Sequence, residues 1–112
     1  MDAIVHQIQS LQGVQEVSIY REGSILASTL LVAKLEKLQL VFRLIEQLFT
    51  ELRQLGKSHN ELCFTFSSQL MLIYKLPNNC MVILITDKRV HKPMLQMGVK
   101  AATRHIDFSV SD

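Results

Sequence analysis

Two cysteines and four histidines are the residues of this chain that could carry nucleophilic or metal chemistry. A catalytic thiol needs a base within reach, and Cys63 with His59 or His91 is the only arrangement of this kind worth considering. Cys63 alternates with Phe64 in an extended segment, so we expect it to pack beneath a helix as an inert thiol. Hydrolysis through Cys63 would instead require a thiol that reacts readily with iodoacetamide in the folded protein.

Metal and phosphate sites have no sequence support. The histidines fall on separate predicted segments without an i, i+4 pair, which favours surface histidines over a metal site: His6, His59, His91 and His105. The stretch LGKSH echoes the end of a phosphate-binding loop, but it lacks the upstream glycine and follows a helix instead of preceding one. We therefore predict no catalytic residue, no metal and no cofactor, and a protein that is not an enzyme.

Composition narrows the class of protein. The 112 residues fit a single domain, 1–112, whose polar end, 107–112, we expect to be frayed. The net charge is +2 without a basic cluster, so we expect no nucleic-acid partner. The chain has no apolar run of membrane-spanning length and no start typical of a signal peptide. These features predict a soluble, cytoplasmic protein with no membrane partner. In that compartment we expect Cys63 and Cys80 to be reduced thiols.

Hydrophobic periodicity predicts the elements of the N-terminal half. Ile4, Ile8 and Leu11 mark a short amphipathic helix over 2–12, ended by Gly13. An extended stretch to Tyr20 and a return over 24–28 form a hairpin around Arg21-Glu22-Gly23. We expect Val17 and Ile19 on one face of the first strand, and Ile25 and Ala27 alternating against Leu26 in the second.

A long helix over 30–55 dominates the chain, since this segment has no Gly or Pro and many strong helix formers. We expect Ser28 or Thr29 to cap its start and Gly56 to end it. Its apolar arc covers about half the circumference, which is more than one small sheet can cover. We therefore expect a second helix from a partner chain to pack there, through Leu35, Leu38, Phe42, Ile45, Phe49 and Leu52.

The C-terminal half predicts three strands and a helix. The segment 61–66 alternates, whereas the strands around 70–74 and 81–85 are apolar on both faces and must be covered on both sides. Pro93 suits the first turn of a last helix, with Gly98 allowing close approach. Four methionines are expected to fill the core: Met71, Met81, Met94 and Met97. The predicted fold is a three-layer α/β/α structure with a five-stranded antiparallel sheet, in the order α-β-β-α-β-β-β-α.

Two phrases resemble the roadblock/LC7 domain family, "GVQEVSIYREGSILAST" (Gly13 to Thr29) and "FSSQLMLIYKLPNNCMVILITD" (Phe66 to Asp87). The resemblance implies a fold related to profilin and longin domains. It also implies dimers that join their sheets edge to edge through Leu62, Cys63, Phe64, Thr65 and Phe66, with the long helices together on one face. Members of this family serve as platforms for Ras-like small GTPases or as light chains of the dynein motor, and some bacterial relatives stimulate a partner GTPase.

The leading interpretation is therefore a non-catalytic dimeric adaptor, as a homodimer or a heterodimer with a related domain, that binds a small GTPase or a motor or signalling protein. Its partner-binding candidates lie on the polar side of the long helix: Arg43, Glu46, Gln47 and Thr50. The alternative is a small-ligand sensor of profilin-like or PAS-like fold, which would need a cavity between sheet and helices that the bulky Leu, Ile and Met content disfavours.

Overall fold

A computed structural model describes residues 1–57, 59–104 and 106. The elements are α1 (Asp2–Gln9), β1 (Val14–Arg21), β2 (Ser24–Ser28), α2 (Val32–Gln54), β3 (Glu61–Thr65), β4 (Gln69–Leu76), β5 (Cys80–Asp87) and α3 (Lys92–Thr103). The five strands form one antiparallel sheet in the spatial order β2-β1-β5-β4-β3. The predicted fold class and order of elements are confirmed, whereas the end at 107–112 and His105 lie outside the described residues.

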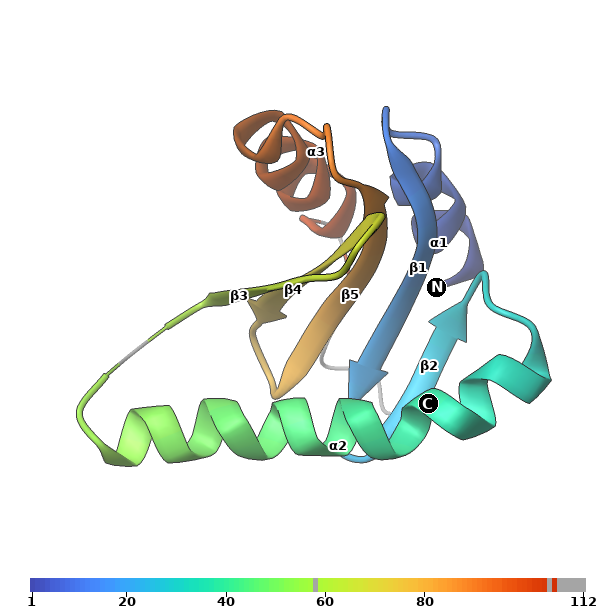
Figure 1. The fold of residues 1–112 in the computed structure, drawn as a ribbon. Coiled ribbons are helices and arrows are strands. Elements are labelled where there is room, and N and C mark those ends of the chain that lie inside the picture. Colours follow the sequence, from blue (N-terminus) through green and yellow to red (C-terminus); the bar gives the residue numbers. More distant parts are fainter. Residues whose placement is uncertain (58, 105, 107–112) are drawn as a thin grey trace.

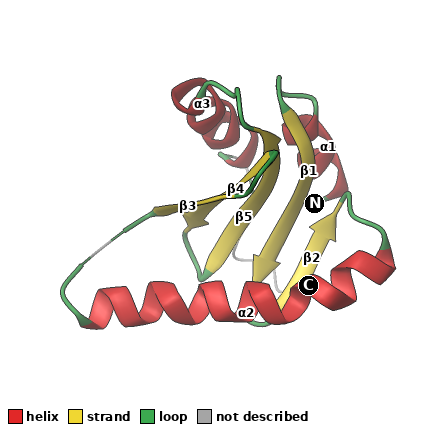
Figure 2. Ribbon diagram, viewed as in Figure 1, coloured by secondary structure: helices red, strands yellow, loops and turns green. Residues whose placement is uncertain are grey.

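The sheet is covered on both faces, as its doubly apolar strands require. Figure 1 shows α1 and α3 on one face and α2 running across the other, and Figure 2 shows the same layers coloured by type of element. One core cluster lies between the sheet and α1 and α3, and includes Val5, Ile8, Leu95 and Val99. A second lies between the sheet and α2, around Phe42, Ile45 and Phe49.

The hairpin turns through two residues with positive φ, Glu22 at 47° and Gly23 at 87°, as a type I′ turn requires. A bulge then changes the faces of β2: Ile19 pairs with Ala27 while Tyr20 pairs with Ile25, which leaves Leu26 as the extra residue. Leu26 and Ala27 thus join the α1/α3 core and Ile25 joins the α2 core. The expected simple alternation of Ile25 and Ala27 against Leu26 is wrong, because one inserted residue shifts the period of two.

Two helix boundaries differ from the predicted ones. Helix α1 ends at Gln9, because Leu11 donates to the carbonyl of Ile8 in a tighter turn and the Ser10 hydroxyl bonds the carbonyl of Gln7 at 2.6 Å. Helix α2 begins at Val32 with Leu31 at its N-cap and no side-chain cap.

The expected caps of α2 are engaged elsewhere. The Thr29 hydroxyl oxygen accepts from the backbone N–H of Val17 at 2.9 Å and donates to the Glu16 carboxylate. The Ser28 hydroxyl accepts from the N–H of Leu30, two residues before the helix. At the other end Gly56 has φ 77°, and the N–H groups of Gly56 and Lys57 bond the carbonyls of Arg53 and Leu52. This Schellman pattern confirms the predicted stop.

Helix α2 is longer than the sheet that it covers. Its 23 residues extend about 35 Å, whereas five strands span about 19 Å across and an eight-residue strand about 26 Å along its length. Its ends therefore project beyond the sheet, which accounts for the exposed side chains of Leu31, Val32 and Leu55. None of the three helices in the described ranges, α2 included, has the apolar length that a bilayer span requires.

Substitution of Gly13 tests this architecture, because both its backbone conformation and the space around it require glycine. It has φ 87°, and a Cβ added there would lie 2.3 Å from Cγ1 of Val90. Gly13→Ala should cost about 1–2 kcal/mol for left-handed backbone and a further about 1–3 kcal/mol for overpacking. Gly23→Ala is the matched control, since it shares φ 87° but has open space around the added carbon. Urea unfolding at one protein concentration should rank Gly13→Ala clearly below Gly23→Ala, and equal losses would contradict the close approach of Val90.

Candidate interaction surface

An apolar surface lies where α2 borders the edge strand β3. Four side chains of α2 are exposed along it, Leu40 at 64%, Val41 at 37%, Leu44 at 56% and Leu48 at 37%. Phe64 in β3 and Phe66, the residue after the strand, are 37% and 52% exposed. A shallow cavity of about 260 Å³ between the two elements is lined almost entirely by apolar side chains, with Ile45 and Met71 at its base. We call these six exposed residues the α2–β3 surface.

Helical spacing explains why α2 is apolar beyond its own core. Phe42, Ile45 and Phe49 are 1%, 4% and 6% exposed and point into the sheet. Val41, Leu44 and Leu48 recur at steps of three and four on the neighbouring stripe, turned toward β3. An exposed apolar patch of this kind marks an interaction site more often than a free surface.

The edge strand adds a row of free backbone groups to this surface. The carbonyl of Asn60 accepts from Lys75 at 2.8 Å and the N–H of Phe66 donates to Gln69 at 2.9 Å, so the even-numbered residues of this segment face β4. Backbone direction alternates along a strand. The N–H and carbonyl groups of Glu61, Cys63 and Thr65 therefore point out from the open edge of the sheet.

The structure separates the residues predicted for helix packing. Phe42, Ile45 and Phe49 lie in the core of their own chain, with Ile45 also at the base of the cavity beside β3. Leu35, Leu38 and Leu52 are half-buried, and Leu38 packs on the α2 core. The exposed stripe is instead Val41, Leu44 and Leu48, with Leu40 beside it. The apolar arc was visible in the sequence, but which part of it faces the sheet depends on how the helix is rotated.

The strand residues predicted for sheet joining lie on two faces. Leu62 is half-buried against the α2 core, and Phe64 and Phe66 lie on the same face. Cys63 and Thr65 are exposed. The expectation of a packed Cys63 is wrong, because α3 leaves the edge strand uncovered. Cys80 is the buried thiol, and burial raises its pKa to about 11.

The four partner-binding candidates divide into two pairs. Arg43 and Gln47 are exposed on the polar side of α2. Glu46 accepts a hydrogen bond from the Tyr20 hydroxyl at 3.2 Å, and the Thr50 hydroxyl donates to the backbone carbonyl of Glu46 at 3.2 Å. Because Tyr20 also packs edge-to-face on Phe42, with ring centroids 6.1 Å apart, Glu46 helps to seat the helix on the sheet.

Two further expectations concern methionine and metal. Met71 and Met81 are buried, but Met94 and Met97 are exposed on the outer side of α3, so the prediction that all four fill the core is wrong for two.

No three His, Cys, Asp or Glu side chains gather closely enough to hold a metal ion within residues 1–57, 59–104 and 106. His91 has a structural role, since its Nδ1 accepts from the N–H of Met94 at the start of α3.

Comparison with known proteins gives a likeness of structure. No family model matches the sequence, and no curated protein matches it either. A roadblock/LC7 domain from Streptomyces avermitilis superposes with a TM-score of 0.80 at 8% identity, over 93% of this chain and 92% of that one. MglB of Myxococcus xanthus gives 0.70 at 11% identity over 92% and 85%, and a structure of MglB with tetrameric arrangement gives 0.72 at 14% over 89% and 79%.

At these identities the likeness concerns the fold alone. It covers most of the chain in each case. The resemblance is confirmed at that level: this chain has the roadblock/LC7 fold.

Proposed function

We propose that the protein is a non-catalytic dimeric adaptor or regulator that binds a Ras-like small GTPase or a motor-type complex. The observation that carries the proposal is the α2–β3 surface, which joins an exposed apolar stripe to a free strand edge. The choice of partner class rests on the family that the sequence resembles, whose members serve as platforms for small GTPases or as motor light chains. A cytoplasmic location is part of the same proposal.

A second copy of the chain fits this surface because it meets both requirements at once. An antiparallel β3–β3 pair would satisfy the outward N–H and carbonyl groups of Glu61, Cys63 and Thr65, which an edge strand otherwise leaves open. The same twofold axis would bring the two α2 stripes together on one face, since a twofold interface places one patch against itself. A strand from a different protein could pair with the edge of β3, but it would leave Leu40 and Leu44 exposed to water.

The register of this pair follows from the length of β3. Pairing all three outward-facing residues of Glu61–Thr65 places Cys63 opposite its own copy and Glu61 opposite Thr65. On the α2 face, Leu62 then lies opposite Phe64 of the other copy, which continues the apolar core across the axis. The structure of MglB with tetrameric arrangement supports assembly as a use of this fold.

The polar side of α2 supplies the proposed contact with the GTPase or motor partner. Arg43 and Gln47 are the exposed candidates there, whereas Glu46 and Thr50 are engaged within the chain. Two α2 helices side by side would present these side chains twice on one broad face. In this proposal the dimer buries the exposed apolar stripe of α2 and also forms the surface that the partner binds.

Leu44→Asp tests the dimer. A carboxylate at the middle of the exposed stripe should prevent two stripes from packing, because a buried unpaired charge costs several kcal/mol. The monomer should stay folded, since Leu44 is 56% exposed in the single chain. Light scattering after size exclusion should give the mass of one chain for Leu44→Asp and of two for the natural sequence.

Arg43→Asp is the matched control for this experiment, because Arg43 is the next residue and points to the polar side of the helix. It should keep the dimer. Phe42→Asp is unsuitable, since Phe42 is 1% exposed and a carboxylate there would unfold the chain. A Leu44→Asp protein that remains a dimer would rule out this interface.

Oxidation tests the strand register. Residues in a hydrogen-bonded antiparallel pair have Cα atoms about 5.5 Å apart, within the range of about 4.4–6.8 Å that a disulfide spans. Mild copper–phenanthroline treatment should convert the dimer into a species linked by Cys63, and Cys63→Ser should remain unlinked. Cys80 provides the internal contrast, because it is buried and its thiol has a pKa raised to about 11. A dimer that oxidation leaves unlinked would contradict the register while leaving the interface in place.

Pull-down from the source organism's extract tests the partner class. The immobilised protein should retain a small GTPase, with a difference between extracts loaded with GDP and with a non-hydrolysable GTP analogue. Arg43→Asp, which keeps the dimer, should weaken this retention about tenfold or more if Arg43 makes a charge-assisted contact. Retention of a motor subunit in place of a GTPase would select the second partner class, and retention of neither would refute the adaptor proposal.

A further inference from the structure

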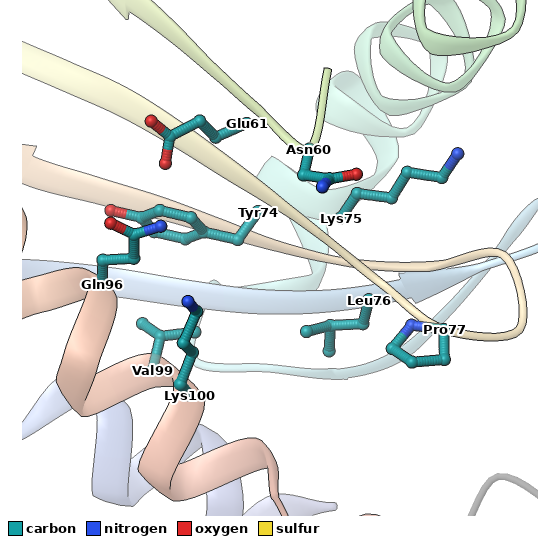
Figure 3. A pocket seen from close by; sticks show the side chains of 9 residues that line it. All are labelled: Asn60, Glu61, Tyr74, Lys75, Leu76, Pro77, Gln96, Val99 and Lys100. Atoms are coloured by element: carbon teal, nitrogen blue, oxygen red, sulfur yellow. The ribbon is translucent and has the colours of Figure 1, made fainter. Parts of the chain in front are cut away.

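A groove on the face opposite α2 is lined by polar groups that the fold does not use. It lies between α3 and the part of the sheet formed by β3 and β4, with a cavity volume of about 450 Å³. Figure 3 shows its lining, with Tyr74 and Glu61 on the sheet and Gln96 and Lys100 extending from α3 beside the Tyr74 ring. Its volume is in the range of small-molecule sites.

Tyr74 is the key polar group of the groove. The residue is 8% exposed, yet among the residues that the structure describes its hydroxyl has no side-chain hydrogen-bond partner. Burial, followed by the nearby Glu61 carboxylate, raises the pKa of the phenol to about 12. The hydroxyl therefore stays protonated at neutral pH and can donate to an acceptor in the groove. The hydroxyl is not among the buried polar atoms of the described residues that lack a partner, so it opens into the groove and is accessible to a ligand there.

Charged groups of both signs lie around Tyr74. Glu61 supplies a carboxylate, and Lys100 supplies an ammonium from α3. Lys75 also borders the cavity, but Figure 3 shows its side chain directed away, and its ammonium lies 5.9 Å from the ring centroid of Phe49 on the α2 side. The Gln96 amide can both donate and accept. The walls between these groups are apolar, formed by Leu76, Pro77 and Val99.

A second cavity extends the groove. Its volume is about 340 Å³, and it shares Glu61, Tyr74 and Gln96 with the first before continuing past Cys63 to Lys92. The three shared residues are thus at the middle of one continuous depression along α3. They come from three different elements, β3, β4 and α3, which only the tertiary structure brings together.

The other large cavity of the described residues differs in the polar groups that line it. It has a volume of about 460 Å³ and lies between Gly13 and the start of α3. Its Asp87 carboxylate accepts from the N–H of Arg89 at 2.9 Å, and its His91 caps α3. These two side chains are engaged in local turns, and the remaining polar side chains of its lining, Gln12 and Arg89, are exposed and supply no carboxylate. The groove beside Tyr74 offers a free carboxylate, an ammonium and a hydroxyl together, and we take it as the ligand site.

We propose that the groove beside Tyr74 binds a small zwitterion with an aliphatic body, such as an α-amino acid. The carboxylate of the ligand would accept from the Tyr74 hydroxyl and face Lys100, its ammonium group would face Glu61, and its side chain would lie on Leu76 and Val99. Gln96 would bond whichever end lies closer to it. The side chains of the groove lie on the α3 face, opposite the apolar stripe of α2, and Glu61 is the member of the site that also lies on the β3 edge of the proposed dimer.

Calorimetric titration of the full chain with L-leucine tests the ligand class. Two leucine analogues of similar shape, each lacking one of its two charged groups, are titrated for comparison. Leucinamide keeps the ammonium and lacks the carboxylate, and 4-methylpentanoate keeps the carboxylate and lacks the ammonium. Each should bind at least about tenfold more weakly than leucine, because each leaves one charged group of the groove unpaired. No saturable binding of leucine up to about 10 mM, or equal binding of either analogue, would overturn the proposal.

Three substitutions place the ligand in the groove. Tyr74→Phe and Lys100→Gln should each weaken leucine binding about tenfold, and Glu61→Gln should remove the preference for leucine over 4-methylpentanoate. Lys100 and Glu61 are exposed, so these two variants test the site even if Tyr74→Phe proves unstable. Arg104→Gln, an exposed cation at the end of the same helix, should bind leucine as the natural chain does.

The monomeric Leu44→Asp variant separates this inference from the adaptor proposal. It should bind leucine with the affinity of the natural chain, because the groove is complete within one subunit. Leucine binding that survives Tyr74→Phe, Lys100→Gln and Glu61→Gln unchanged would place the ligand elsewhere and refute this site.

Discussion

The apolar surface of α2 is larger than its own chain can cover, and most features of this molecule depend on that mismatch. The sheet is shorter than the helix in both directions and accepts only the side chains around Phe42, Ile45 and Phe49. Leu40, Val41, Leu44 and Leu48 remain in water beside a strand edge with free backbone groups. The proposed dimer would bury the first and pair the second, so hydrophobic burial and backbone hydrogen bonding would act at the same side of the molecule.

The two faces of the sheet have different roles as a result. On the α2 face, Tyr20 seats the helix by packing on Phe42 and bonding Glu46, so the stripe that remains exposed is held at a defined angle to the edge strand. On the other face, the turn after α1 approaches α3 closely at Leu11 and Gly98, where a Cβ added to Gly98 would lie 2.8 Å from a Leu11 methyl carbon. Helix α3 consequently sits toward the middle of the sheet and leaves β3 uncovered. That offset exposes Cys63 and opens the groove beside Tyr74.

Architecture was largely predictable from the sequence because it depends on short-range patterns. Apolar periods of two and 3.6 located the strands and helices, and Gly23, Gly56 and Pro93 marked turns and boundaries through local backbone geometry. The expected alternation in β2 and the expected Thr29 cap of α2 were wrong for a shared reason. A bulge opposite Tyr20 and the engagement of Thr29 with Glu16 are contacts between segments, and no local pattern reveals them.

The sequence by itself determined that one helix carries an apolar arc too wide for a small sheet, and that the meander strands are covered on both faces. Tertiary structure alone decided which part of the arc is left over, because rotation of α2 about its axis depends on packing against Tyr20, Met71 and Ile83. It also decided that Phe42 is core while Leu44 is surface, and that Glu61, Tyr74 and Lys100 meet in one groove. Side-chain periodicity shows which face of a helix or strand is apolar. The element that this face contacts is decided only when all the elements pack together.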